Sequence, residues 1–230
     1  ISNNGMVADT TGVYSAYLKS QGVNTKPYHS GRPEGKYLVV GAFMPQQTGN
    51  PLVTDILEWV NEGNTLIVLN NNIDAWAAHL AQKEVLDYRG LKVLGNTWYG
   101  GNFFSKQHSL FNGLPQAQVF NWEYQCFATY NKSRIGLRLF NGEPVVACVA
   151  DHKPEVYSAV SIVPHGRGKI ILSTLDIFSC LRDVNIGLRA EGEGENAAMN
   201  TFNASRRNSA NIVGKQLLLN MIKLANNNLK

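Results

Sequence analysis

The stretch "LIVLNNNIDAWAAHL" (residues 66–80) joins an apolar run to an amphipathic segment through three consecutive asparagines. Its first four residues carry no polar side chain, which is typical of a strand buried on both faces. From residue 73 onward, apolar side chains recur at helical spacing and predict a helix of about residues 73–86. A buried strand followed by a polar turn and a helix is the repeating unit of α/β folds.

The same alternation continues on both sides of this stretch. A helix is expected at residues 10–20, after a Thr cap, and further apolar runs and helical segments follow: "KYLVVGAF" (36–43), "PLVTDILEWVNEG" (51–63) and "LKVLG" (91–95). Apolar strands separated by amphipathic helices predict a parallel sheet covered by helices on both faces. We therefore expect residues 1–95 to form a βαβα unit of flavodoxin type.

The pattern changes after Gly95. Residues 95–115 are rich in Gly, Asn and aromatic residues and predict a long loop, and strand-like runs follow at 119–130, 134–140, 144–150 and 157–177. Within the last run, "PHGRG" (164–168) predicts the turn of an antiparallel hairpin. Residues 182–208 suggest an exposed excursion with part of a helix, and residues 210–225 a helix with one apolar face.

Taken together, these segments predict an α/β three-layer sandwich, with a mainly parallel sheet extended by an antiparallel hairpin. A content of 44% hydrophobic and 17% charged residues suits one globular domain over residues 1–230. The chain begins at Ile1 without a signal-peptide pattern, so we expect it to be the C-terminal part of a longer chain whose signal peptide is not in the sequence. No run of about 18 apolar residues is present, so no membrane span is expected.

Several classes of partner and cofactor are not expected. The net charge of +4 is spread along the chain, without the basic stripe and interleaved aromatics of a nucleic-acid surface. Cys126, Cys148 and Cys180 have no CxxC spacing, and no HxH or HExxH motif is present, so we expect no metal and no cofactor. Three cysteines leave at least one thiol free, and Cys148 has the pattern of a small buried hydrophobic residue.

Four segments in one order carry a family resemblance: "HSLFNGLP" (108–115), "NWEYQ" (121–125), "GRGKIILSTLDI" (166–177) and "LLLNMIKLA" (217–225). They resemble the class I glutamine amidotransferase-like domains attached to bacterial glycoside hydrolases. The chain is most similar to the accessory domains of family-two β-galactosidase-like proteins from gut-type Bacteroidetes. The resemblance covers most of the second half of the chain, whereas the first half shares only the α/β rhythm.

The resemblance places a cysteine nucleophile at a strand-to-helix turn, with a later His and Glu. In this chain the corresponding turn is Asn70, Asn71 and Asn72, a degenerate nucleophile elbow. None of these amides can form an acyl intermediate, so amidotransferase chemistry is not expected. The asparagines have a structural reading as well, because Asn tolerates the dihedral angles of tight turns and one of them, or Asp74, can cap the next helix.

Aromatic and acidic residues in the middle of the chain suit a carbohydrate site. Aromatic rings stack on the apolar faces of sugars, while carboxylates and amides bind the hydroxyl groups. The candidate ligand-binding residues are Trp98, Tyr99, His108, Trp122, Glu123, Tyr124 and Asp176. Core packing is the alternative for the tryptophans, and capping of the following turn is the simpler role for Asp176.

The resemblance and the missing nucleophile together imply a non-catalytic accessory domain of a secreted or periplasmic glycoside hydrolase. Its partner would be a catalytic module in the same chain, with carbohydrate as a further ligand. One alternative is a glycan-active hydrolase that uses Glu123 and Asp176, which requires a carboxyl separation that sequence does not reveal. A second alternative is an oligomerisation domain that buries the "NNNLK" helix end (226–230) or residues 182–208 between subunits.

Overall fold

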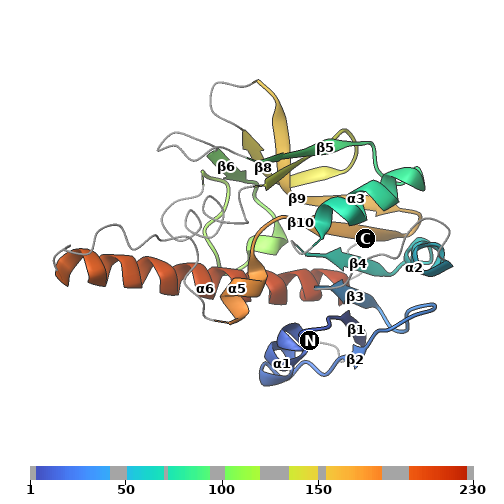
Figure 1. Ribbon diagram of the computed structural model, residues 1–230, viewed down its shortest axis with the longest axis horizontal. Coiled ribbons are helices and arrows are strands. Elements are labelled where there is room, and N and C mark those ends of the chain that lie inside the picture. Colours follow the sequence, from blue (N-terminus) through green and yellow to red (C-terminus); the bar gives the residue numbers. More distant parts are fainter. Residues whose placement is uncertain are drawn as a thin grey trace.

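The computed structural model describes residues 4–41, 51–69, 72–93, 102–119, 135–149, 154–182 and 197–226, without the side chains of 51–53, 93, 102 and 197–210. In this part of the chain a ten-stranded mixed sheet carries helices on both faces (Figure 1). The predicted α/β class is confirmed: the core of the sheet is parallel, antiparallel strands extend it, and five α-helices pack on it.

The parallel core has the strand order β2-β1-β3-β4-β10. Its strands are β1 (Gly5–Ala8), β2 (Lys26–Pro27), β3 (Tyr37–Val40), β4 (Thr65–Val68) and β10 (Gly168–Ser173). Leu38 of β3 lies opposite Leu66 of β4, which lies opposite Ile170 of β10. Every residue of β3 and β4 is buried, as expected of strands covered on both faces.

The antiparallel part extends the core through the predicted hairpin. β9 (Val156–His165) pairs with β10 around the turn at residues 166–167, so this prediction is confirmed. β9 also pairs with β7 (Ile135–Leu139) and β8 (Glu143–Val149). β7 pairs in turn with β5 (Tyr88–Val93), and β8 pairs with β6 (Asn102–Ser105). The antiparallel part is therefore larger than one hairpin.

Three details of the expected strand arrangement are wrong. β5 contains residues 91–93 of the run that was expected to join the parallel unit, but it pairs antiparallel with β7 at the other end of the sheet. β6 and a 3-10 helix, η1 (Ser109–Phe111), lie within the expected long loop. The short strands β1 and β2 were not expected, because four or fewer residues give too little periodicity to detect.

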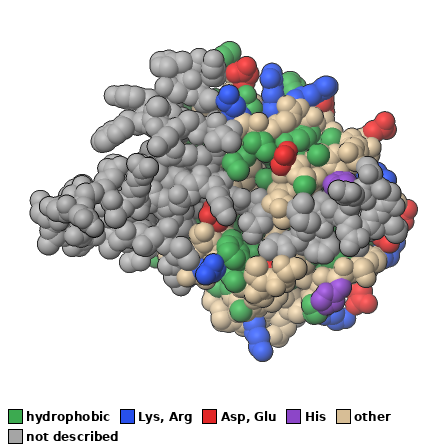
Figure 2. All heavy atoms as spheres, viewed as in Figure 1, with side chains coloured by type: hydrophobic (Ala, Val, Ile, Leu, Met, Phe, Trp, Pro, Cys, Tyr) green, Lys and Arg blue, Asp and Glu red, His purple; other side chains and the backbone are tan. Residues whose placement is uncertain are grey.

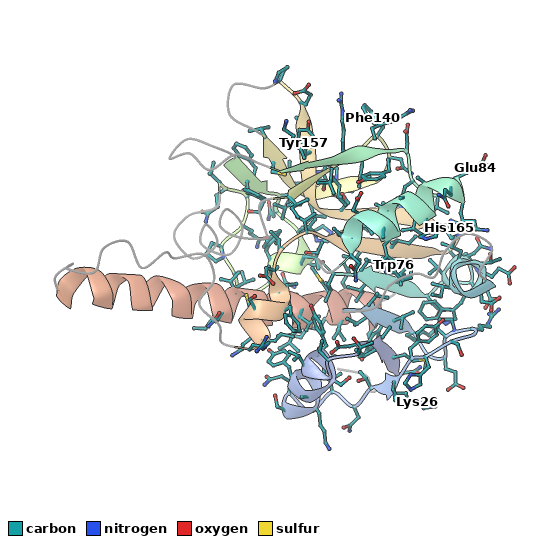
Figure 3. All side chains as sticks on the ribbon, viewed as in Figure 1. Lys26, Trp76, Glu84, Phe140, Tyr157 and His165 are labelled. Carbon is teal, nitrogen blue, oxygen red and sulfur yellow. The ribbon has the colours of Figure 1, made fainter. Side chains whose placement is uncertain are left out.

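Helices cover both faces of the parallel core. α2 (Pro51–Asn61) and α3 (Ile73–Gln82) bury Trp59 and Trp76 against one face, where Trp76 lies beneath α3 (Figure 3). α1 (Val13–Ser20) and α6 (Ala197–Asn226) cover the other face with Tyr14, Leu18 and Leu217. α6 begins within the predicted excursion and extends well beyond the sheet (Figure 1), whereas residues 183–196 lie outside the described part.

The tip of the β9–β10 hairpin packs against the end of α2. The Arg167 amide donates a hydrogen bond to the Asn61 carbonyl oxygen at 3.0 Å, and the Lys169 amide donates to that of Asn64 at 3.2 Å. A Cβ atom on Gly168 would lie 2.0 Å from the Val60 carbonyl oxygen. The "GRG" segment is thus a packing element, in agreement with its interpretation as a hairpin turn.

Acidic and basic side chains are interspersed around the rim of the described surface (Figure 2). The ion pairs include Lys26–Glu34 at 2.8 Å and Lys106–Glu143 at 3.4 Å, and the side chains of both pairs are about half exposed or more. Such exposed pairs contribute little to stability, so the fold is stabilised mainly by the two apolar layers.

Candidate functional site

The carboxyl ends of the parallel strands form the edge where open α/β sheets usually bind ligands, outside the point at which the strand order reverses. That point lies between β1 and β3, because the chain continues from β1 to β2 on one side and from β3 to β4 on the other. The described turns at this edge are β1–α1 and β10–α5, where α5 is Ile177–Leu181. Residues 42–50 and 70–71, which follow β3 and β4, lie outside the described part.

Asp9 organises the β1–α1 turn. Its carboxylate accepts hydrogen bonds from the Thr11 amide at 2.9 Å and from the Tyr14 amide at 3.0 Å. The N-cap position is Gly12, which has a φ of 73° and no side chain to bond the helix. The expected Thr contributes from one residue earlier, because the Thr11 hydroxyl accepts a hydrogen bond from the Val13 amide at 3.3 Å. Thr11 and Asp9 together thus satisfy the first two helical amide groups.

Asp176 organises the β10–α5 turn in the same way, and its predicted capping role is confirmed. One carboxylate oxygen accepts from the Ser179 amide at 3.2 Å, and the other accepts from the Ser179 hydroxyl at 2.8 Å. The residue is 6% exposed. Both oxygens of this candidate are therefore already engaged within the protein.

Tyr14 lies between these two turns, and its ring centroid is 5.9 Å from that of Phe178. The side chain is fully buried, and its hydroxyl has no hydrogen-bond partner in the described part of the chain. Burial raises the pKa of this phenol well above its ordinary value, and the charges of Asp176 and Asp9 raise it further. Tyr14 is therefore a neutral core residue at physiological pH, and proton transfer from its hydroxyl is disfavoured.

The described cysteines, Cys148 and Cys180, are buried and form no disulfide with each other. Burial raises the pKa of Cys148, and it raises the pKa of Cys180 strongly, with the Asp176 charge acting in the same direction. Because the thiolate is the reactive form, neither thiol is suited to act as a nucleophile. The expectation that Cys148 is a small buried hydrophobic residue is confirmed, and Cys126 lies outside the described residues.

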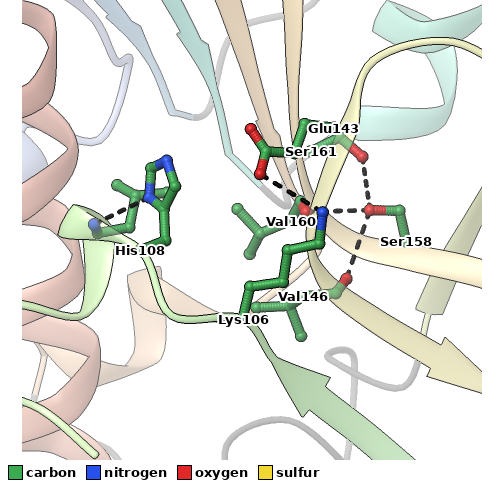
Figure 4. A network of polar contacts seen from close by, with 8 residues as sticks. Lys106, His108, Glu143, Val146, Ser158, Val160 and Ser161 are labelled. Carbon is green, nitrogen blue, oxygen red and sulfur yellow. Dashed lines mark hydrogen bonds and ion pairs between the residues drawn. The ribbon is translucent and has the colours of Figure 1, made fainter. Parts of the chain in front are cut away.

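His108 caps the 3-10 helix η1, since its Nδ1 atom accepts a hydrogen bond from the Leu110 amide at 3.1 Å (Figure 4). Burial is the main cause that lowers the pKa of this half-buried imidazole; Glu143 raises it, and Lys106 and Lys169 lower it. With Nδ1 as acceptor, the neutral ring carries its proton on Nε2. His108 thus has a structural role and keeps one N–H group for a further partner.

A buried pair of serines, Ser158 and Ser161, lies on β9 where this strand pairs with β8 (Figure 4). The Ser161 hydroxyl donates to that of Ser158, which lies 3.0 Å from the Val160 carbonyl oxygen and 3.4 Å from that of Val146. The β8–β9 register shifts on both sides of Val146. The serines therefore bond backbone groups at an irregular point of the ladder, a role that the sequence did not reveal.

Most of the remaining candidates lie in segments that the structure does not describe. Trp98, Tyr99, Trp122, Glu123, Tyr124, Asn70 and Asn71 lie outside the described residues. Asn72 is described, with a φ of 63° at the N-cap of α3, but its exposed side chain makes no cap hydrogen bond. Asp74 instead accepts a hydrogen bond from the Tyr88 hydroxyl. Capping of α3 by either of these two side chains is therefore wrong, whereas the tolerance of Asn for unusual dihedral angles is confirmed at Asn72.

His108 and Asp176, the two described ligand-binding candidates, each bond to their own turn, and no hydrogen bond between them occurs in the described residues. A groove that was not predicted lies elsewhere, between α1, α5 and α6, with a volume of about 540 Å³. Its residues come from three elements far apart in sequence, so no local pattern could reveal it. Within the described ranges, no helix is long and apolar enough to span a membrane, and no three His, Cys, Asp or Glu residues gather as metal ligands.

No protein-family model and no curated protein matches the sequence. Among solved structures, an exo-β-1,4-mannosidase from an Opitutaceae bacterium is 11% identical with a TM-score of 0.46, and the match covers 85% of this chain and 29% of that one. A β-galactosidase from Bacillus circulans is 10% identical with a TM-score of 0.47, covering 75% and 28%. A ThuA-like protein from Parabacteroides merdae is 11% identical with a TM-score of 0.47, covering 92% and 90%.

The chain spans less than a third of the length of the two glycoside hydrolases that it matches.

Proposed function

We propose that this chain is a non-catalytic accessory domain of a secreted or periplasmic glycoside hydrolase of the β-galactosidase type. It packs against a catalytic module of the same polypeptide or helps to bind carbohydrate. The observation that carries the proposal is the Asn70–Asn72 sequence between β4 and α3, where class I amidotransferase folds hold their nucleophile. An amide at that position keeps the turn but cannot form an acyl intermediate.

The chemistry of the described side chains supports a non-catalytic role. Asp176 is committed to capping α5, His108 to capping η1, and the thiols of Cys148 and Cys180 are buried with raised pKa values. Each of these groups stabilises the fold in place of facing a substrate. The ordered series of segments from "HSLFNGLP" to "LLLNMIKLA" supports the link to glycoside hydrolases.

The first test is the intact mass of the native polypeptide that carries this sequence, compared with the 25.4 kDa of these residues. We expect about 80 kDa or more, because a catalytic module and further domains of ordinary size would share the chain. A native mass near 25 kDa would exclude a catalytic module in the same polypeptide and would contradict the proposal. Cell fractionation of the source organism would test the periplasmic or extracellular location separately.

A second test addresses the elbow itself. Asn71→Ala in the whole enzyme should leave the turnover of an aryl galactoside unchanged, since no bond to substrate is made at this position in the proposed role. The matched control is a carboxylate of the catalytic module, whose removal should abolish turnover. A large loss of turnover in Asn71→Ala, with the melting temperature unchanged, would overturn the non-catalytic assignment.

A further inference from the structure

The groove between α1, α5 and α6 is lined by residues of different chemistry. Val13, Ala16, Tyr17 and Ser20 lie on one face of α1, since they are spaced at i, i+3, i+4 and i+7. The other lining residues are Gln21, which follows α1, Leu181 and Arg182 at the end of α5, and Lys215 of α6. The groove's volume of about 540 Å³ falls within the range of small-molecule sites.

Two charged residues are among the described lining of this groove, and both are cations. The guanidinium carbon of Arg182 lies 5.5 Å from the centroid of the Phe178 ring, so the arginine is held over an aromatic face. Lys215 is half-buried on α6. None of the described residues that line the groove is acidic, so this part of the lining favours an anion.

Neutral polar groups at the end of α1 are arranged by local hydrogen bonds. The Ser20 hydroxyl donates to the Tyr17 carbonyl oxygen at 2.7 Å, and the Gln21 amide nitrogen donates to the Ser20 hydroxyl at 3.2 Å. The Tyr17 hydroxyl bonds the Lys215 carbonyl oxygen at 3.4 Å and so ties α1 to α6 across the groove. A primary amide has two N–H groups, which leaves Gln21 a second donor for a ligand.

The apolar residues of the lining favour a ligand that has an apolar face. Val13, Ala16 and Leu181 offer aliphatic surface beside the Tyr17 ring. A bare inorganic anion would leave this surface in contact with water, whereas a molecule with both an acid group and an apolar face would cover it. The groove therefore fits an organic acid with an apolar face better than a phosphate or sulfate ion.

We propose that this groove binds a small organic acid of hexuronate size, with its carboxylate on Arg182 and Lys215 and its apolar ring face on Tyr17 and the aliphatic wall. Arg182 can bind a carboxylate through two parallel N–H groups, and Lys215 adds a point charge. The groove is separate from the Asn70–Asn72 turn in sequence, and the inference does not depend on the proposed accessory role.

Calorimetric titration of the native protein with galacturonate, galactose and sulfate tests this inference. Galacturonate should bind saturably in the millimolar range or tighter, and more tightly than either galactose, which lacks the acid, or sulfate, which lacks the apolar face. Arg182→Gln should weaken galacturonate binding about tenfold, as expected for the loss of one charge-assisted hydrogen bond. Lys19→Gln is the matched control, because it removes an exposed cation of α1 that does not line the groove.

Three results would overturn the inference. They are equal binding of galactose and galacturonate, equal binding of sulfate and galacturonate, and an equal loss of affinity in Arg182→Gln and Lys19→Gln. The absence of saturable binding would do the same. Melting temperatures of both variants confirm folding, because Arg182 and Lys19 are exposed and neither substitution should move the transition by more than a few degrees.

Discussion

A methyl group added at Gly168 would lie 2.0 Å from the carbonyl oxygen of Val60 and 2.3 Å from that of Asn64. Both oxygens belong to the backbone at the end of α2, so neither can turn aside as a flexible side chain would. Gly168→Ala should therefore lower the free energy of unfolding by about 2–3 kcal/mol, as overpacked core sites do. Urea unfolding of the variant and the wild-type protein measures this difference.

Gly113→Ala is the control for this steric effect. Gly113 has a φ of 78° but nothing within 4 Å of an added Cβ atom, so only backbone strain opposes the substitution. That strain costs about 1–2 kcal/mol. A smaller loss in Gly168→Ala than in Gly113→Ala would mean that the hairpin tip can move away from α2.

His108 connects stability to pH through its role as a cap. Because its pKa is lower in the folded than in the unfolded protein, the unfolded state binds more protons at mildly acidic pH. The contribution of His108 to the free energy of unfolding is fully present above the pKa of the unfolded state, about 6.5. It is lost as the pH falls towards the lower pKa of the folded state. Unfolding free energies measured from about pH 8 to about pH 5 should show this decline.

His108→Asn tests the assignment, because asparagine keeps a side-chain acceptor for the Leu110 amide but does not titrate. Its unfolding free energy should fall less than that of the wild-type protein over the same pH range. His108→Ala should be less stable at every pH, by about 1 kcal/mol, since it removes the cap. Parallel pH profiles for the wild-type protein and His108→Asn would refute a role for this imidazole.

At the scale of elements, the side chain of Asn220 joins α6 to the η1 segment through hydrogen bonds. Its side-chain amide donates to the carbonyl oxygens of Leu110 at 2.8 Å and Asn112 at 2.9 Å, and the residue is 2% exposed. Asn220→Ala should lower the free energy of unfolding by about 2–3 kcal/mol, because two carbonyl groups lose their partner. Chemical denaturation measures this loss.

Gln216→Ala provides the comparison on the same helix. Gln216 is half-buried and donates a 2.9 Å hydrogen bond to the Asn220 side chain. Its removal leaves both bonds to the η1 segment in place, so we expect a loss below about 1 kcal/mol. If the two variants were equally stable, α6 would be held by its apolar face alone.

Elements with a local signal were predicted well. α1, α2 and α3, the strands β3 and β4, and the β9–β10 hairpin follow from apolar periodicity and turn residues within each segment. The position of β5 did not follow, because its partner β7 comes more than 40 residues later and nothing in the segment at 88–93 specifies that pairing. Strand type is thus encoded locally, whereas strand order depends on distant residues.

The candidate site shows the same limit. Residue type and position at the end of an element make His108 and Asp176 candidates for ligand binding. Both are helix caps in the structure. Helix caps and ligand sites use the same residue types, so sequence does not separate the two roles. The groove with Arg182 and Lys215 depends on the meeting of α1, α5 and α6. Its lining residues share no motif, so only the packed structure reveals it.

At the scale of the whole molecule, one apolar cluster joins the two parts of the sheet. It contains Tyr14 and Val39 from the parallel part, Cys148 from the antiparallel part, Cys180 from α5 and Leu217 from α6. Because Cys148 and Cys180 share this cluster, we expect both thiols to become reactive in the same unfolding event. Maleimide labelling in increasing urea, in a Cys126→Ser background, should give one midpoint for both residues.

The matched control is the same labelling above the urea transition, where both thiols should react at the rate of small-molecule thiols. Separate midpoints for Cys148 and Cys180 would show that the two parts of the sheet open independently. The expectation of a single domain over residues 1–230 would then be wrong.

The place of β10 in the sheet has a consequence for synthesis on the ribosome. β10 lies between β4 and β9, although β4 spans residues 65–68 and β10 spans residues 168–173. A nascent chain that ends before Gly168 therefore leaves β4 with one bare edge, which can recruit a strand of another chain. Folding must wait for this late strand, so truncated products should aggregate, and slower translation upstream of residue 168 should lower the yield of the native protein.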